Sequence, residues 1–247
     1  MNRYQILIEY VGTNYSGWQI QKKGKTIQGK IQKVISKILK EKINIIGSGR
    51  TDSGVHAIEQ SAHFDTSAKI KDSNKFLKSI NHFLYRYGIS ILDLKKRELT
   101  FHSRYSAKAR IYKYVILNRK SGSVLKNKRC WHIIKKLNLA MMKKGAKKLI
   151  GTKDFSTFRS SSCSAKTPVR TIKSIKFLMS YCLPMEVTRV STNVRMSDLV
   201  SLTGRHMRVL KPSYLFKDTA ITPLPASASI SSAGFPYSSV NPASDPT

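Results

Sequence analysis

A strand pattern followed by an amphipathic helix pattern restricts the folds that this chain can adopt. Residues 3–10 place a tyrosine or an isoleucine at every second position, which is typical of a strand with one buried face. Thr26 precedes residues 27–39, where isoleucines recur at helical spacing and lysines occupy the other face. Because both apolar faces must be buried, the pattern predicts a sheet covered by helices.

The same two patterns recur along the chain as far as residue 177. Further strands are predicted at 43–47, 55–64, 90–94, 109–118 and 169–177, and further helices at 73–84 and 138–150. No glycine-rich phosphate loop opens these helices, which argues against a dinucleotide-binding fold. We therefore expect an α+β protein whose mixed or antiparallel sheet is flanked by helices.

Charge is the second constraint on this chain. It carries 45 basic and 13 acidic residues, a formal net charge of +32. A field of this strength is typical of proteins that bind nucleic acid, because each neutralised phosphate releases counterions. A lysine-rich solvated surface is the alternative. Residues 179–247 hold only six basic and four acidic residues, so the positive charge is concentrated in residues 1–178.

The sequence also bears on the cellular compartment. It has no run of about 18 apolar residues, so we expect no transmembrane helix. The first residues lack the basic, apolar and cleavage segments of a secretory signal. Cys130, Cys163 and Cys182 lack metal-ligand spacing and are expected to be small buried thiols of a reduced, cytoplasmic protein.

Residues 49–57, Gly-Arg-Thr-Asp-Ser-Gly-Val-His-Ala, place a rare carboxylate on a glycine-flanked loop. Asp-Ser-Gly alone is most often a turn in which the aspartate bonds to its own backbone. Arg50 precedes Asp52 by two residues, so in an extended segment both side chains share one side of the chain. These two residues are therefore the first candidates for chemistry.

Four segments together resemble the bacterial tRNA pseudouridine synthase A family. They are residues 10–21, 49–57, 101–114 and 151–159, and they occur in the family's order. The resemblance covers residues 3–177 and is specific because it rests on four ordered motifs. It implies an α+β enzyme of two related halves that works as a homodimer, with residues 1–105 as the first half, 106–178 as the start of an incomplete second half, and 179–247 as an atypical tail.

The resemblance also implies a reaction. Members isomerise uridine to pseudouridine at positions 38–40 of the tRNA anticodon stem-loop, without a cofactor or metal. Asp52 is then the nucleophile, which attacks either the sugar or the base. Arg50 helps to hold the flipped nucleotide, with a phosphate contact or a structural ion pair as its alternative. Tyr112 stacks on the uracil, or else is a core tyrosine of its strand.

Other residues of the four segments have two open interpretations. Tyr15 and Trp18 either contact RNA or pack under the loop, while His56 is expected to be structural. The aromatic and basic residues within 155–159 either line the site or belong to the core and the surface. Paired lysines, as at 143–144 and 147–148, suit contacts with the tRNA backbone or a solvated helix face.

After residue 177 the resemblance stops. The family's closing strands, and the arginine that pairs with its aspartate, are expected to be missing apart from a faint echo at residues 194–196. Residues 219–247, rich in serine and proline, are expected to be disordered. We hypothesise that the tail is the family's coding sequence in a shifted frame, because residues 223–232 read one base earlier permit the family's ending. Sequencing the locus tests this, and an uninterrupted frame without such an ending nearby removes the hypothesis.

These departures set up two alternatives for function. Without the arginine and the closing strands, the sequence predicts a weakly active or inactive tRNA-uridine isomerase. The alternative is a non-catalytic, basic RNA-binding protein derived from such a synthase. Loss of pseudouridine with retained tRNA binding in an Asp52→Asn variant would favour the enzyme.

Overall fold

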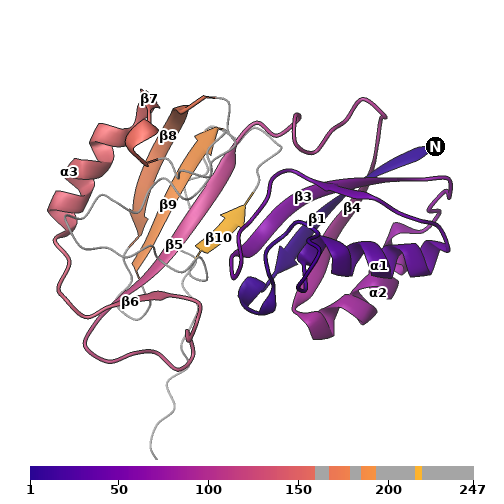
Figure 1. Cartoon of the computed structure of the whole chain (residues 1–247), viewed down its shortest axis with the longest axis horizontal. Coiled ribbons are helices and arrows are strands. Elements are labelled where there is room, and N and C mark those ends of the chain that lie inside the picture. Colours follow the sequence, from indigo (N-terminus) through magenta and orange to yellow (C-terminus); the bar gives the residue numbers. More distant parts are fainter. Residues whose placement is uncertain (159–166, 179–184, 193–214, 219–247) are drawn as a thin grey trace, which may run out of the picture.

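A computed structural model describes residues 1–158, 167–178, 185–192 and 215–218 of the chain. In these ranges ten strands form one sheet, whose path runs β4-β1-β3-β10-β5-β9-β8-β7, with β2 beside β3 and β6 beside β5 (Figure 1). The strands are β1 (Asn2–Tyr10), β2 (Ile45–Gly47), β3 (His56–Thr66), β4 (Ile89–Arg97), β5 (Arg110–Asn118), β6 (Trp131–Ile133), β7 (Gly151–Asp154), β8 (Val169–Leu178), β9 (Met185–Thr192) and β10 (Leu215–Asp218). The helices are α1 (Ile27–Leu39), α2 (Ser73–Leu84) and α3 (Leu139–Leu149), with 3₁₀ turns η1 (Gly12–Asn14), η2 (Tyr85–Tyr87) and η3 (Ser156–Phe158).

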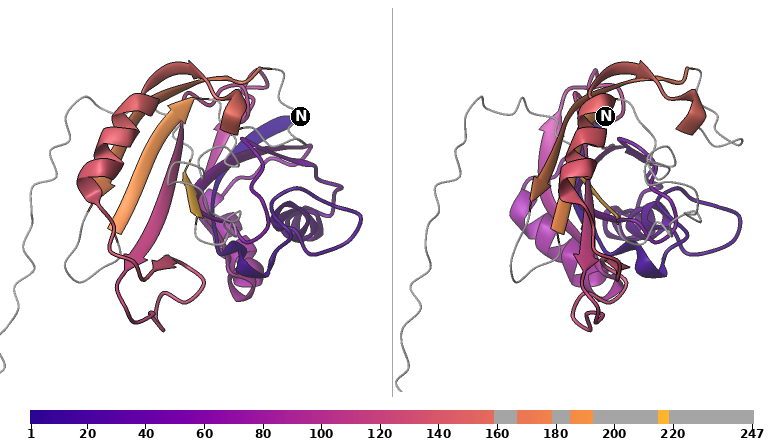
Figure 2. Two further views of the ribbon diagram at one scale, coloured as in Figure 1. Left: turned by 60° about the vertical axis from the view of Figure 1, so that its left-hand side comes forward. Right: turned by 90° about the vertical axis from the view of Figure 1, so that its left-hand side faces the viewer.

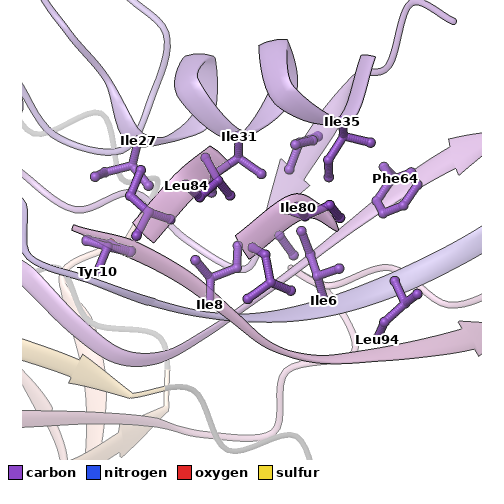
Figure 3. Packing of buried hydrophobic residues seen from close by; sticks show 14 of the residues in the cluster. Ile6, Ile8, Tyr10, Ile27, Ile31, Ile35, Phe64, Ile80, Leu84 and Leu94 are labelled. Atoms are coloured by element: carbon purple, nitrogen blue, oxygen red, sulfur yellow. The ribbon is translucent and has the colours of Figure 1, made fainter. Parts of the chain in front are cut away.

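The first core lies between helices α1 and α2 and strands β1, β3 and β4. Figure 3 shows isoleucines of α1 and α2 directed at the apolar residues of β1, which alternate as a half-buried strand requires. Ile6, Ile8 and Ile31 are completely buried. The helices α1 and α2 lie over this part of the sheet, while α3 packs near β8 at the far end (Figures 1 and 2). The mixed α+β class with a mostly antiparallel sheet is confirmed.

Local signals set the ends of the helices. The Thr26 hydroxyl accepts a hydrogen bond from the backbone N–H of Gly29 at 3.3 Å, so it caps α1 as predicted. Helix α2 occupies the predicted residues and is capped by Asp72, whose carboxylate accepts from the Lys75 N–H at 2.9 Å. Helix α3 begins after Asn138 and ends one residue before the predicted limit.

Strands β9 and β10 correct the prediction that the closing strands of the sheet are missing. Strand β10 pairs with β3 in parallel and with β5 antiparallel, so it joins the two parts of the sheet. Strand β9 lies between β5 and β8. A four-residue strand has too few positions to show a period, and its partners are remote in sequence. The frame-shifted ending proposed for residues 223–232, and the disorder expected for 219–247, lie outside the described residues.

Polar residues occupy the opposite face of β1 and β3, under the segment that follows β4. His63 is 1% exposed, and its Nδ1 lies 2.9 Å from the Ser103 hydroxyl and accepts the Ser103 backbone N–H at 3.2 Å. Because Nδ1 accepts, the neutral ring carries its proton on Nε2, which is buried and has no hydrogen-bond partner in the described residues. Burial, followed by the nearby positive charge of Arg3, lowers the pKa of His63 to about 4.

The lowered pKa of His63 predicts that the free energy of unfolding depends on pH. This pKa is lower in the folded protein than in the unfolded chain, so the unfolded state binds more protons between about pH 6.5 and about pH 4. The free energy of unfolding should therefore fall as the pH drops through this window and level off, for this group, below it. Urea unfolding at several pH values checks this, with a shallower dependence expected for His63→Gln. Equal slopes in both proteins would contradict the assignment.

Candidate active site

The loop of residues 48–55, called here the Asp52 loop, connects β2 to β3 and is held by buried polar contacts. The Tyr10 hydroxyl lies 2.8 Å from the Thr51 hydroxyl and donates to the Gln60 side-chain oxygen at 3.2 Å. The Gln60 amide in turn donates to the Gly49 carbonyl at 3.1 Å. Burial raises the pKa of Tyr10, which keeps its phenol protonated and able to donate. The backbone on both sides of Arg50 is thus fixed.

The segment after β1 supports the Asp52 loop from below. The backbone N–H of Trp18 donates to the Thr51 carbonyl at 3.0 Å. The Tyr15 carbonyl accepts from the Ser53 hydroxyl at 3.0 Å and from the Gly54 N–H at 3.3 Å. Tyr15 and Trp18 are only 7% and 3% exposed. Of the two interpretations, packing under the loop is therefore what the structure shows.

Two glycines permit this close approach of backbones. A Cβ on Gly12 would lie 1.9 Å from the Val55 carbonyl oxygen, far inside van der Waals contact. Gly17 has a φ of +104°, and a Cβ there would lie 2.6 Å from the Thr51 carbonyl oxygen. The Gly12 N–H also donates to Nδ1 of the buried His56 at 3.2 Å. This contact confirms the structural interpretation of His56.

The two predicted polar residues of the loop are exposed to solvent. Asp52 and Arg50 are both exposed, whereas Thr51 between them is buried. In the described part of the chain, neither side chain forms a salt bridge or a hydrogen bond. Among the described residues, nothing therefore occupies the Asp52 carboxylate, and none holds Arg50 in a structural ion pair.

Strand β5 brings a second set of residues to the loop. Tyr112 is 5% exposed and packs against Val55, three residues after Asp52, with Tyr114 beside it. Arg110, on the same face of β5, donates to the Ser48 carbonyl at 3.0 Å. The structure thus brings Tyr112 to the Asp52 loop, but as a largely buried ring. Arg110 was not predicted from the sequence, although its position two residues before Tyr112 places it on the same face.

The fourth motif packs away from the Asp52 loop. Phe155 is 6% exposed and forms a small core with Leu149 and Ile172, against which Phe158 packs. The core interpretation therefore holds for Phe155, while Arg159 lies outside the described residues. Cys130 is buried and free, as expected, whereas the other two cysteines lie outside the described ranges.

No group of three or more His, Cys, Asp or Glu side chains in the part of the chain that the structure describes is arranged to hold a metal ion. Among the described helices, none combines the length and the hydropathy needed to cross a bilayer.

Comparison with known proteins identifies the family to which the chain is similar. A family model described as tRNA pseudouridine synthase matches residues 6–106 and 146–200, more than half of the chain. tRNA pseudouridine synthase A of Pelagibacter ubique (strain HTCC1062) is 65% identical over 175 residues, which cover 71% of each chain. The proteins of the same name from Thermoanaerobacter sp. (strain X514) and Thermoanaerobacter pseudethanolicus (strain ATCC 33223 / 39E) are each 46% identical over 172 residues, 70% of each chain.

The chain therefore belongs to the tRNA pseudouridine synthase family, a family of isomerases. The resemblance predicted from four motifs is confirmed. The family model extends to residue 200 and includes the echo at residues 194–196, so the expectation that the resemblance stops after residue 177 is wrong. Those three residues lie outside the described ranges.

Proposed function

We propose that this protein isomerises uridine to pseudouridine at positions 38–40 of the tRNA anticodon stem-loop, with Asp52 as the nucleophile. The observation that carries the proposal is an exposed carboxylate, without a partner among the described residues, on a loop whose neighbouring backbone is fixed from both sides. A nucleophile needs such accessibility together with a defined position. The chain as a whole is strongly basic, as binding of an RNA substrate requires.

The reaction rearranges bonds within one nucleotide. The N1–C1′ glycosidic bond breaks, the uracil turns, and a C5–C1′ bond forms; N1 gains a proton and C5 loses one, so the composition is unchanged. Asp52 forms a transient covalent bond to the sugar or to the base, and both routes remain compatible with its position. The uridine must leave the helical stack to reach the carboxylate. No cofactor enters this scheme.

Arg50 and Tyr112 are proposed to hold the extruded nucleotide. The guanidinium of Arg50 is exposed and has no partner in the described ranges, so it suits a phosphate of the flipped nucleotide, because charge-assisted hydrogen bonds of this kind are strong. Tyr112 would stack on the uracil and limit its tilt while it turns. Since the ring is only 5% exposed, stacking requires that tRNA binding uncovers it.

The remaining parts of the proposal concern assembly. We propose two related halves, with a boundary near residue 105, and a homodimer in the cytoplasm. Strand β10 lies where these two halves would meet. The part of the tail beyond residue 200, where the family model ends, is proposed to be atypical for the family, apart from the described strand β10.

The function is tested with unmodified tRNA transcripts that carry uridine at positions 38–40. After incubation with the full chain, pseudouridine is mapped by base-specific chemical labelling and primer extension. Modification confined to positions 38–40, and absent when these uridines are replaced by cytidines, is expected. Modification elsewhere would contradict the proposed position, and tRNA binding without any modification would favour the non-catalytic alternative.

A further inference from the structure

The turn η2, which joins α2 to β4, presents aromatic and basic side chains to solvent. Tyr85 is 80% exposed and Tyr87 is 36% exposed. The Lys30 ammonium lies 3.9 Å from the centre of the Tyr87 ring, and the Arg86 guanidinium carbon lies 5.0 Å from it. The Tyr85 side chain has no hydrogen bond or ring contact with the described residues. The turn thus combines one strongly exposed ring, Tyr85, with a second ring, Tyr87, that lies beside two cations, and folding alone does not require this combination.

This turn is attached directly to the residues that hold the Asp52 loop. The Tyr15 hydroxyl donates to the Tyr87 carbonyl at 2.8 Å. The carbonyl of the same Tyr15 accepts from Ser53 and Gly54. A backbone hydrogen bond from Val11 to the Gly88 carbonyl, at 2.8 Å, adds a second attachment. Tyr15 therefore links η2 directly to the Asp52 loop, because it forms hydrogen bonds with both.

The two segments that form the surroundings of η2 contain basic residues but no acidic ones. Residues 10–40, which include Tyr15 and Lys30, contain seven lysines and no aspartate or glutamate. Residues 73–92, which include η2, also contain no aspartate or glutamate. A surface that combines exposed aromatic rings with positive charge suits a nucleic acid, which offers phosphates and flat bases, better than it suits a protein partner.

We propose that η2, together with Lys30, binds the RNA strand next to the uridine that is extruded toward Asp52. In this arrangement Tyr85 stacks on an unpaired base of the loop, and Arg86 and Lys30 contact phosphates. The shared attachment through Tyr15 fixes the distance between this contact and the nucleophile. The inference rests on the proposed function, because it takes the anticodon stem-loop as the ligand.

The test measures binding of an anticodon stem-loop RNA to the full chain by fluorescence anisotropy at several salt concentrations. Tyr85→Ala should weaken binding about tenfold, while Tyr85→Phe, which keeps the ring, should bind like the original protein. Arg86→Gln should reduce the slope of log Kd against log salt by about one unit. Lys75→Gln is the charge-matched control, because Lys75 lies at the other end of α2, about 16 Å away at 1.5 Å per residue.

Three outcomes would overturn the inference. Unchanged affinity in the Tyr85→Ala and Arg86→Gln variants would show that η2 does not touch RNA. An equal loss in Lys75→Gln would show a diffuse charge effect instead of a site. A change in oligomeric mass for Tyr85→Ala, with RNA affinity retained, would assign the turn to a subunit contact.

Failure of this inference and failure of the proposed function are distinguishable. Pseudouridine formation by the original protein, combined with unaltered RNA affinity in the η2 variants, overturns the inference alone. RNA binding that depends on Tyr85, without any pseudouridine formation, contradicts the proposed reaction and leaves the RNA contact standing.

Discussion

Replacing Asp52 by asparagine will reduce the rate of pseudouridine formation by about 10⁴-fold or more, the scale of loss seen when a nucleophile is removed. Asparagine has nearly the same size, but its amide cannot supply the electron pair that the carboxylate supplies. The Asp52 side chain forms no hydrogen bond or salt bridge in the described residues, so the fold should be unaffected. Affinity for tRNA should be kept or slightly increased, because one negative charge is lost.

The matched control for this prediction is Asp72→Asn. It makes the same chemical change at another exposed aspartate, and asparagine caps a helix about as well as aspartate. Rates are measured by release of tritium from 5-labelled uridine in tRNA, and folding by circular dichroism. A normal rate in the Asp52→Asn protein would exclude Asp52 as the nucleophile.

A second large effect is expected for Gly12→Ala. The added Cβ would lie 1.9 Å from the Val55 carbonyl oxygen, so the backbones of the two segments must move apart. This movement strains the contacts of Gly12 with His56, and a displacement of about 1 Å at a reacting group can cost on the order of 100-fold in rate. The overpacked contact should also lower the free energy of unfolding by about 1–3 kcal/mol.

Gly145→Ala serves as the control for this substitution. Gly145 lies inside α3, and no atom of the described residues outside the backbone of its own helix is within 4 Å of the place where its Cβ would be. Alanine is the better helix former, so this variant should be about 0.5–1 kcal/mol more stable with an unchanged rate. Urea unfolding and tritium release on both variants check the pair. A Gly12→Ala protein with normal rate and stability would contradict the role assigned to this contact.

Much of the first core could be predicted from the sequence because its signals are local. Thr26 marks the start of α1, and the alternation in residues 3–10 indicates which face of β1 is buried. Strand β10 could not be predicted, since it has four residues and pairs with strands about 100 and 160 residues away in the chain. The place of β10 in the sheet depends on contacts with distant strands, and the spacing of apolar residues within a short segment carries no information about such contacts.

The candidate site shows the same division. Asp52 and Arg50 could be selected because they belong to one short, ordered motif. The contacts that position them could not, because Gly12 meets Val55 and Arg110 meets Ser48 across more than 40 residues of sequence. Tyr112 was assigned a base-stacking role by resemblance, and its burial beside Val55 is information that only the folded chain provides.

The most direct test of the account is single-turnover tritium release from tRNA labelled at C5 of uridine, with the full chain in excess over tRNA. The exposed Asp52 carboxylate predicts that release depends on this residue. We expect release that exceeds that of the Asp52→Asn variant at every time point and that maps to positions 38–40. Equal release from the two proteins, with tRNA bound by both, would contradict the assignment of Asp52 as the nucleophile.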